Sequence, residues 1–373
     1  MLWSGSWLEN LSAGSLPGEE MMDAPDRPRL RTAHYGLGDI GKQVVVLLAR
    51  RPDVDIVAAL DTNPRNVGRD LGEVVGLGRG LGVLVSYDPE LVVSRTETDV
   101  VLHATSPYLS IALPQLLPLL ASGKSIVSAC DELVYPWVSH PEMAARLDAT
   151  AKDGGAALLA VGAGPGFVTD SLPLFLASAC TEVEALSVTR VIDLTKEPAT
   201  ARAAAGLGMT VDAFCRAADE GDVGFPALLD SVSLMAARLG WQPDRLVETI
   251  EPIRASKRRE TDATIVETGR VAGVRQLARA YRSDAEILRV NVIALLEAAD
   301  PHDAILVRGR PPVSARIEGG IPSHLAFAAL MVHTLPALAS ARPGLLSVTD
   351  LLSIRADRRD RSLSAFWARR GRP

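Results

Sequence analysis

The segment RLRTAHYGLGDIG, residues 29–41, decides the fold because its glycines mark a change from strand to helix. A short apolar-tending run leads into it, and an apolar helical pattern follows at residues 44–48. In such a unit the first glycine permits a sharp turn, the second lets a pyrophosphate approach the backbone, and the third lets the helix pack on the strand. The anion then lies on free N–H groups at the positive helix end. The predicted dinucleotide-binding residues are Gly36, Leu37, Gly38, Asp39, Ile40 and Gly41.

The residues after this helix extend the same pattern. A second predicted strand, residues 55–60, ends at Asp61, twenty residues past Gly41. A carboxylate at this place accepts hydrogen bonds from a ribose 2′-hydroxyl. Arg65 and Arg69 follow, and an arginine pairs with a 2′-phosphate that Asp61 would repel. We therefore expect NAD, with NADP tolerated, and include Arg65 in the cofactor site; the alternative leaves both arginines on a solvent-exposed helix.

The composition limits the class of protein. At 373 residues the chain exceeds one typical core, so two domains are expected. It is 47% hydrophobic and 23% charged with a formal charge of −6, which indicates a globular protein with no electrostatic case for nucleic acid. Cys130, Cys180 and Cys215 form no CxxC pair, so we expect a reducing cytoplasm and no metal. The most apolar stretch, residues 111–120, is too short to span a bilayer.

The chain divides into four expected parts. Residues 1–28 lack a basic n-region and a continuous apolar core, which favours a mobile tail over a signal peptide. A dinucleotide-binding Rossmann domain is expected over residues 29–165 and a substrate and dimerisation domain over residues 166–322. In residues 323–373 we expect a core helix, residues 323–340, that returns to the first domain and an exposed Arg-rich end.

A third strand places polar residues beside the predicted cofactor. Residues 99–103 read as a buried strand that ends at His103, and Thr105 and Ser106 follow it. In an open α/β sheet the ligand lies beyond the carboxyl ends of the strands. We therefore expect Thr105 and Ser106 to line the cofactor crevice. For His103 we favour a strand residue with a satisfied ring over a proton carrier.

Two adjacent carboxylates follow the next strand. Asp131 and Glu132 come just after residues 125–129, with Tyr135 and Trp137 close behind. A carboxylate that aromatic neighbours partly desolvate has a raised pKa and exchanges protons near neutral pH or holds a cationic amine. The alternative is that both cap the following turn and point to water. We favour the functional interpretation.

A second glycine-rich loop, residues 162–166, opens another helix, with Asp170 near its first turn. It could face the nicotinamide side of the crevice, where Gly166 would contact the cofactor, or form the hinge into the second domain. The two roles are compatible.

From about residue 182 the periodicity changes to long alternating runs with few helices between them. Such runs predict a mainly antiparallel sheet with one buried face. The expected fold is therefore α/β: a Rossmann-type doubly wound parallel sheet plus a second α+β domain with a mainly antiparallel sheet.

The motifs together resemble those of the 2,4-diaminopentanoate dehydrogenases and the related native amine dehydrogenases, whose first domain resembles dihydrodipicolinate reductase. The resemblance runs from Arg31 to about Asp350. It rests on the order and spacing of GLGDIG, HATSPYLS, SACDELVYPW, GAGPGFVTD, GDVGFPALLDSVSLMAARLGW with the later Glu251-Pro252, ETGRVAGVRQ, IEGGIP and PGLLSVTDL.

The resemblance implies NAD(P)-dependent oxidative deamination of an amine to a ketone and ammonia, and reductive amination in reverse. A family carboxylate from a Cys-Glu-Glu-Leu stretch handles the amine, which maps onto Asp131 and Glu132. Glu132 is the first choice because it is identical. The chain departs from the family pattern at residues 190–208, where relatives carry more basic residues, and at residues 320–327, where relatives have Gly-Asp and then Ala-Thr.

In the expected mechanism Glu132 holds the nitrogen and shuttles its proton. Tyr135, Trp137, Phe167 and His324 shape the pocket and exclude water, because an iminium otherwise hydrolyses. A homodimer through the second sheet is a further expectation from the family.

Three alternatives remain. A true dihydrodipicolinate reductase would use a His-His pair and a nearby Lys in the second domain, and the sequence has no such pair. A reductase acting on an amino acid would need arginines for the substrate carboxylate; the candidates are Arg190, Arg202, Arg270 and Arg275. A non-catalytic NAD(P)-binding sensor is the third.

Overall fold

The glycine turn lies between a strand and a helix, as the sequence predicts. The computed structural model describes residues 29–262 and 264–351, so the expectations for the tail of residues 1–28 and for the Arg-rich end lie outside the described residues. Strand β1 (Leu30–Tyr35) leads through the turn into helix α1 (Asp39–Leu48), which is followed by β2 (Val54–Leu60). The two strands pair in parallel.

Seven strands form the first sheet in the order β15-β6-β5-β4-β1-β2-β3, and every neighbouring pair is parallel. The order runs outward in both directions from β1 and β4, which is the doubly wound arrangement that we predicted. The remaining strands are β3 (Val85–Ser86), β4 (Val100–His103), β5 (Ser125–Ser128), β6 (Ala157–Ala160) and β15 (Gly344–Leu346). The three-residue strand β15 was not predicted, because it is too short to show a period.

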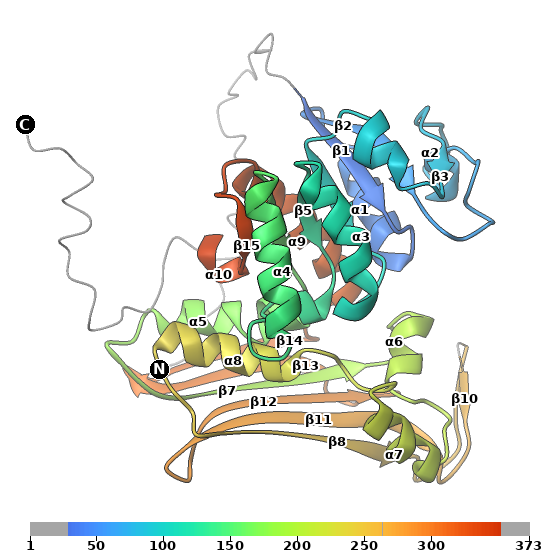
Figure 1. Cartoon of the computed structure of the whole chain (residues 1–373). Helices are drawn as coiled ribbons and strands as arrows, with labels where there is room; N and C mark the ends of the chain where they lie inside the picture. Colours follow the sequence, from blue (N-terminus) through green and yellow to red (C-terminus); the bar gives the residue numbers. More distant parts are fainter. Residues whose placement is uncertain (1–28, 263, 352–373) are drawn as a thin grey trace, which may run out of the picture.

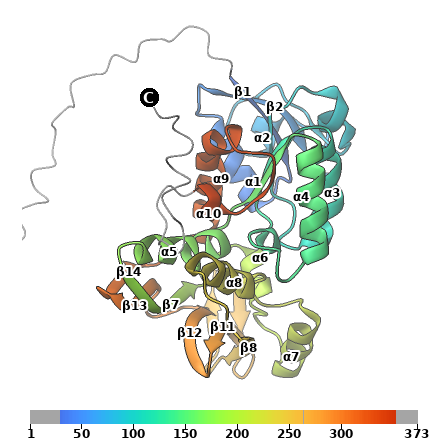
Figure 2. The same cartoon turned by 60° about the vertical axis from the view of Figure 1, so that its left-hand side comes forward.

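Helices cover both faces of this sheet (Figure 2). On one face α1 packs against α9 (Ser323–Ala339), where Val44 and Leu48 meet Met331 and Leu335 in a buried cluster. On the other face α3 (Leu109–Ala121) packs against α4 (Pro141–Asp153). Each fully buried leucine in these layers stabilises the fold by about 1.5–3 kcal/mol. Short helices α2 (Leu71–Val74) and α10 (Val348–Leu351) complete this part.

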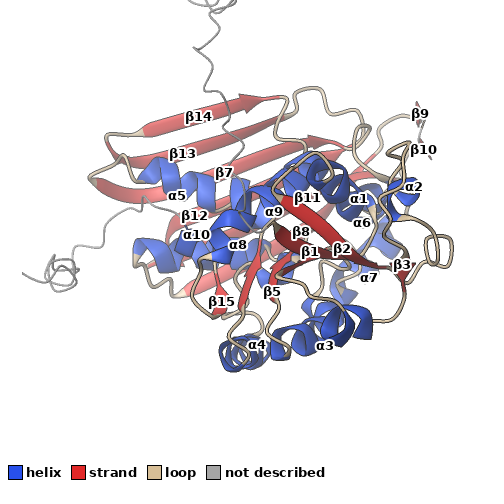
Figure 3. Ribbon diagram, turned by 90° about the horizontal axis from the view of Figure 1, so that it is seen from above, coloured by secondary structure: helices blue, strands red, loops and turns tan. Residues whose placement is uncertain are grey.

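The second sheet has six strands in the order β14-β13-β7-β12-β11-β8, of which β14, β13 and β7 are seen as neighbours in Figure 3. Only the β7–β12 pair is parallel, so the prediction of a mainly antiparallel sheet is confirmed. The strands are β7 (Glu182–Asp193), β8 (Arg245–Arg254), β11 (Val271–Arg282), β12 (Ala285–Leu295), β13 (His302–Arg310) and β14 (Val313–Glu318). A separate hairpin joins β9 (Arg259–Thr261) to β10 (Thr264–Val266).

Helices α5 (Ser171–Ala177) and α8 (Leu228–Leu239) lie between the two sheets, above β7 and β12 (Figure 1). The alternation of the strands explains this packing, because Leu186, Val188 and Val290 are buried on the face that α5 and α8 cover. Helices α6 (Ala199–Ala204) and α7 (Val211–Glu220) lie toward one end of the sheet. Among the described helices none is long and apolar enough to cross a membrane.

The chain passes between the sheets twice, once after β6 and once before α9. Residues 29–165, 166–322 and 323–373 remain our proposed domain limits. A buried ion pair between Arg190 and Asp303 forms hydrogen bonds with both of these connecting segments. Arg190 of β7 donates from Nε to Asp303 Oδ1 (2.8 Å), from Nη1 to the carbonyl of Ala163 (3.2 Å) and from Nη2 to the carbonyl of Ile321 (2.8 Å). Asp303 Oδ2 accepts the N–H of Ile321 (2.8 Å).

This pair yields a stability prediction. Removing one partner of a buried ion pair leaves an uncompensated charge, which costs about 3–5 kcal/mol. Asp303→Leu should therefore lower the free energy of unfolding by about that amount in urea denaturation. The double variant Arg190→Met with Asp303→Leu should be more stable than Asp303→Leu alone, since no charge stays buried. The exposed Arg316, changed to Met, is the control and should leave the midpoint nearly unchanged. A double variant as unstable as the single one would contradict the prediction.

Candidate functional site

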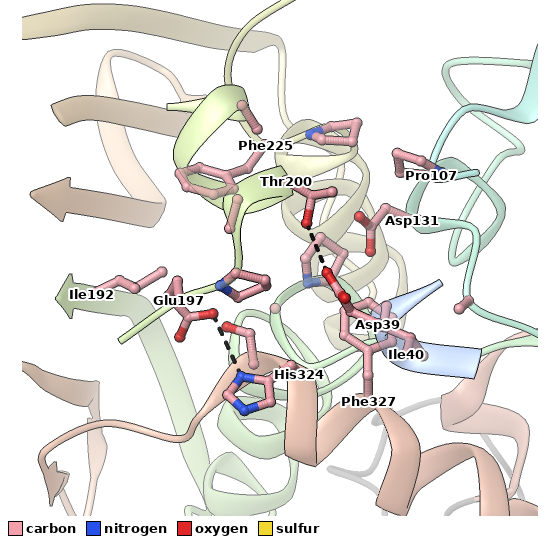
Figure 4. A pocket seen from close by; sticks show the side chains of 18 of the residues that line it. Asp39, Ile40, Pro107, Asp131, Ile192, Glu197, Thr200, Phe225, His324 and Phe327 are labelled. Atoms are coloured by element: carbon pink, nitrogen blue, oxygen red, sulfur yellow. Dashed lines mark hydrogen bonds and ion pairs between the residues drawn. The ribbon is translucent and has the colours of Figure 1, made fainter. Parts of the chain in front are cut away.

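A cavity of about 370 Å³ lies between the carboxyl ends of the first sheet's strands and the second sheet. Ligands of open α/β sheets bind at this place, outside the point where the strand order reverses. The first domain contributes the glycine turn and the segments after β4 and β5, and the second domain contributes side chains of β7, α6 and β12. The start of α9 closes the cavity from a third side (Figure 4).

The glycines of the turn differ in what they contact. A Cβ on Gly36, whose φ is +97°, would lie 2.3 Å from the carbonyl oxygen of Ala104, and one on Gly41 would lie 2.0 Å from that of Gly36. These two glycines are needed for close backbone packing. Gly38 is different, since no atom lies within 4 Å of a Cβ placed there. Gly38, Asp39 and Ile40 line the cavity, so the open space at Gly38 and the N-terminus of α1 suit a pyrophosphate.

Asp61 connects the turn to the end of β2. Its Oδ2 accepts the N–H of Leu37 (3.1 Å) and a side-chain N–H of Asn66 (2.9 Å), and its Oδ1 accepts the N–H of Asn63 (2.8 Å). Three donors therefore stabilise its negative charge. Arg65 is exposed nearby, and its backbone N–H bonds to the side chain of Asn63. Neither Asp61 nor Arg65 lines the cavity itself; both lie along the edge where an adenosine half would extend.

Two polar residues follow β4 in the chain. Thr105 and Ser106 both line the cavity. The imidazole of His103 lies behind them, within 3.0 Å of Ser128 Oγ and Thr105 Oγ1 and 2.8 Å of Gln115 Oε1. Burial lowers the pKa of His103 to about 4, so the ring is neutral. Its hydrogen bonds position the loop, which agrees with the satisfied strand histidine that we favoured.

The two adjacent carboxylates point to different places. Asp131 lines the cavity, whereas Glu132 does not. Oε2 of Glu132 accepts the N–H of Leu109, the first residue of α3 (2.6 Å), and lies 3.5 Å from Nε2 of His140. Glu132 therefore caps a helix. Asp131 and Glu132 begin a single short turn, Asp131–Leu133, and this explains how neighbours in sequence diverge.

Asp131 has an unusual environment for a carboxyl group. Its Oδ1 atom is buried and has no hydrogen-bond partner among the described residues. Burial, reinforced by the negative charge of Glu132, raises the pKa of Asp131 to about 8. Desolvation disfavours the charged form, and a neighbouring like charge adds to the effect. A carboxyl group with such a pKa can both accept and donate a proton near neutral pH.

Of the four predicted pocket residues only His324 lines the cavity. His324 lines the cavity, together with Ser323 and Phe327 of α9. Tyr135 and Trp137 contact each other with tilted rings, whose centroids are 5.0 Å apart, and lie outside the lining. Phe167 packs on the core of the second domain. Gly166, which donates its N–H to Asp170 (2.7 Å), does not line the cavity; Gly164 and Pro165 of the same loop do.

Several lining residues were not predicted. Tyr108, Glu197 and Phe225 come from connecting segments without a periodic pattern. Phe225 is held by Gln276, which accepts its N–H at 2.6 Å and donates to its carbonyl at 2.9 Å. The only available signal was the GDVGFP motif, which marks a turn but does not show which way Phe225 points. Within residues 29–262 and 264–351 no group of His, Cys, Asp or Glu could hold a metal ion.

Two family models match the chain. The model described as "2,4-diaminopentanoate dehydrogenase C-terminal domain" matches residues 167–363, and the one described as "Dihydrodipicolinate reductase, N-terminus" matches residues 32–130. The first of these covers more than half of the 373 residues. The glycine turn and the carboxylate of Asp61 fall in the match to the reductase N-terminus, and Glu197 and His324 fall in the match to the dehydrogenase.

Individual proteins show the same likeness. A 2,4-diaminopentanoate dehydrogenase from Acetoanaerobium sticklandii is 25% identical over 87% of this chain and 93% of its own. An amine dehydrogenase from Streptomyces virginiae is 29% identical over 63% of this chain and 65% of its own. The solved structure of an amine dehydrogenase from Mycobacterium smegmatis matches with a TM-score of 0.79 and 25% identity, covering 87% of this chain and 97% of that one.

The raised pKa of Asp131 yields a pH prediction. Between about pH 4, where an unfolded aspartate ionises, and pH 8, the native protein keeps a proton that the unfolded chain has lost. The free energy of unfolding therefore falls as pH rises through this window. Asp131→Asn cannot ionise, so the stability of the wild type relative to this variant should fall between about pH 4 and 8 and then level off. Urea midpoints of the wild type and of this variant, measured across this pH range, test the prediction.

Asp170 and Asp230 also have raised pKa values, about 6 each, but their contributions cancel in the comparison because both proteins contain them. A difference that does not vary with pH would contradict the assignment.

Proposed function

The chain belongs to the 2,4-diaminopentanoate dehydrogenase family, and from this premise we propose that it is an NAD(P)-dependent amine dehydrogenase. It oxidises an amine to a ketone and ammonia and catalyses reductive amination in reverse. The observation that carries the proposal is the position of Asp131, a carboxyl group with a pKa near 8 in a cavity that also contains the glycine turn. The group that would exchange the proton and the proposed site of the nicotinamide then lie in the same cavity.

The residues of the first domain fit a dinucleotide. The backbone N–H groups at Gly38, Asp39 and Ile40 would hold the pyrophosphate, Asp61 and Arg65 would lie beside the adenosine ribose, and Thr105 and Ser106 would flank the nicotinamide half. When bound, the nicotinamide ring accepts a hydride from the amine carbon or returns it to the iminium carbon. The open space in front of Gly38 supports this fit.

Asp131 would move the proton. In the oxidative direction its carboxylate takes a proton from the substrate ammonium, because only the neutral amine can release a hydride. In the reductive direction its carboxylic acid donates the proton that lets water leave and the iminium form. A pKa near 8 serves both directions, since it lies close to neutral pH. Glu132 would act indirectly, because its negative charge helps to raise the pKa of Asp131.

The walls of the cavity would protect the iminium from water. Apolar side chains from four elements and two connecting segments line the interior: Ile192, Leu194, Phe225, Leu228, Val292 and Phe327. Limited access of water matters in the reductive direction, because an iminium that hydrolyses before the hydride arrives returns to ketone and ammonia. In the oxidative direction one water must add to the iminium carbon after hydride transfer to give the ketone and ammonia. Tyr135 and Trp137, whose rings contact each other shortly after Asp131 in the chain, would support the loop that carries it.

An amino-acid substrate is less well supported. Arg190 lines the cavity, but Asp303 and two carbonyl groups occupy its guanidinium. Arg202 donates to the carbonyl of Glu197, and Arg275 donates to Asn291. Among the described residues that line the cavity Arg190 is the only arginine, and its charge is already paired with Asp303.

The choice of cofactor follows from Asp61. Its carboxylate is fixed by three N–H donors, and a fixed negative charge there repels a 2′-phosphate. We therefore favour NAD over NADP, with Arg65 close enough to let NADP bind. For the compartment we keep the cytoplasm, because Cys130, Cys180 and Cys215 are all free thiols.

A ketone assay tests the proposed reaction. The full chain with NADH, ammonia and ketones of graded size should oxidise NADH, and more slowly with NADPH. Asp131→Asn should lower turnover by about 10²–10⁴-fold, the usual contribution of general acid–base catalysis, while NADH binding followed by fluorescence stays intact. Glu132→Gln should lose far less. Turnover that survives Asp131→Asn and disappears in Glu132→Gln would return the catalytic role to Glu132. No oxidation with any ketone, despite NADH binding, would favour the sensor.

A homodimer through the second sheet is the proposed assembly. The face of this sheet turned away from α5 and α8 carries Leu306, which is 51% exposed, beside Arg289 and Arg308. Light scattering should give about twice the chain mass of 39.6 kDa. Leu306→Arg should yield monomers, since it replaces an exposed apolar side chain on this face with a charged one, whereas Ile265→Arg on the β9–β10 hairpin is the control. A monomeric wild type would contradict the proposal.

A further inference from the structure

A second polar position lies in the cavity, across from Asp131. Glu197, between β7 and α6, and His324, in the first turn of α9, both line the cavity. Oε2 of Glu197 is 3.8 Å from Nδ1 of His324. In Figure 4 the two side chains face each other on the side of Ile192, and Asp131 and Pro107 lie on the other side. The side chain of Glu197 is 10% exposed.

The side chains of Glu197 and His324 both lack a hydrogen-bond partner in the described part of the cavity wall. A separation of 3.8 Å is too long for a hydrogen bond. Within the described part of the chain no hydrogen bond ends on the carboxylate of Glu197; Arg202 donates to its backbone carbonyl instead. Nδ1 of His324 is buried without a partner. Buried polar groups nearly always have partners, so a pair left open toward a cavity indicates a ligand that supplies them.

The surroundings make this pair selective. Ile192, Leu194, Val292 and Phe327 line the wall beside it, and none of them offers a side-chain hydrogen bond. In pockets of this kind a few polar groups on apolar walls fix which end of a ligand points where. Asp131 would receive the reacting nitrogen, so Glu197 and His324 face the part of the substrate away from that nitrogen.

We propose that Glu197 and His324 bind a second hydrogen-bond donor of the substrate, a hydroxyl or an ammonium group on the same small amine that reacts beside Asp131. The inference rests on the proposed amine dehydrogenase function. A carboxylate only accepts hydrogen bonds, so Glu197 takes either donor and repels a substrate carboxylate. The preferred substrates are therefore amines with a hydroxyl or a second amino group, ahead of simple alkyl amines and amino acids.

Four amines of matched size test this proposal: 4-aminopentan-1-ol, pentane-1,4-diamine, hexan-2-amine and 4-aminopentanoate. The full chain is assayed with NAD for oxidative deamination, and the series is repeated with one methylene fewer and one more. The alcohol or the diamine should exceed hexan-2-amine in kcat/KM by about tenfold or more, the typical effect of a hydrogen bond to a charged group. The acid should be the poorest substrate.

A variant and a matched control assign the effect to the pair. Glu197→Met should abolish the preference for the polar amines and leave kcat/KM for hexan-2-amine within a few fold. Glu184→Met, the same change at a 69% exposed position on β7, should leave the preference unchanged. If Glu197→Met does not fold, the comparison of amines on the wild type still decides.

The outcomes separate the two proposals. Deamination of hexan-2-amine as fast as of the alcohol and the diamine at every length would overturn this inference and leave the dehydrogenase function standing. No deamination of any amine and no amination of any ketone would overturn both. A preference for the alcohol alone identifies a hydroxyl, and a preference for the diamine alone identifies an ammonium group; either supports the pair.

Discussion

The buried ion pair of Arg190 and Asp303 is the interaction on which the rest of the structure depends. Its guanidinium bonds to Ala163 on the outward passage of the chain and to Ile321 on the return. It thereby fixes the second sheet against the carboxyl ends of the first, and the cavity exists only because those two surfaces face each other. A charge buried this deeply is tolerated because Asp303 balances it and each of the three guanidinium nitrogens donates a hydrogen bond. The same pairing makes Arg190 a poor candidate for binding a substrate carboxylate.

The sequence predicted the parts of the molecule that depend on local patterns. The glycine turn, the parallel strands around it and the change to long alternating strands follow from backbone geometry and side-chain period, and the structure contains all of them. The site was harder. Asp131 and Glu132 are neighbours with the same chemistry, and the sequence favoured Glu132. What separates them is the N–H of Leu109, which bonds to Glu132 and leaves Asp131 facing the cavity.

Residues that the sequence did not select have a common property. Glu197, Phe225 and Tyr108 lie in connecting segments, where no periodicity tells which way a side chain points. Their positions depend on contacts between distant segments, such as the bonds from Gln276 to Phe225. The aromatic pair Tyr135 and Trp137 shows the opposite case, because their closeness in sequence to the carboxylates suggested pocket residues, whereas neither side chain lines the cavity and Trp137 is 37% exposed. The sequence shows which residue types are present, but it does not show which way their side chains point.

The return of the chain through α9 and β15 has a consequence for how the molecule can move and evolve. Since β15 pairs with β6, the first sheet is built from both ends of the described chain, and the second sheet is an insertion held at two points. Two connections, both bonded to Arg190, restrict the relative movement of the two sheets more than a single connection would. Substitutions within the inserted segment can therefore change one wall of the cavity while the strand order of the first sheet stays the same.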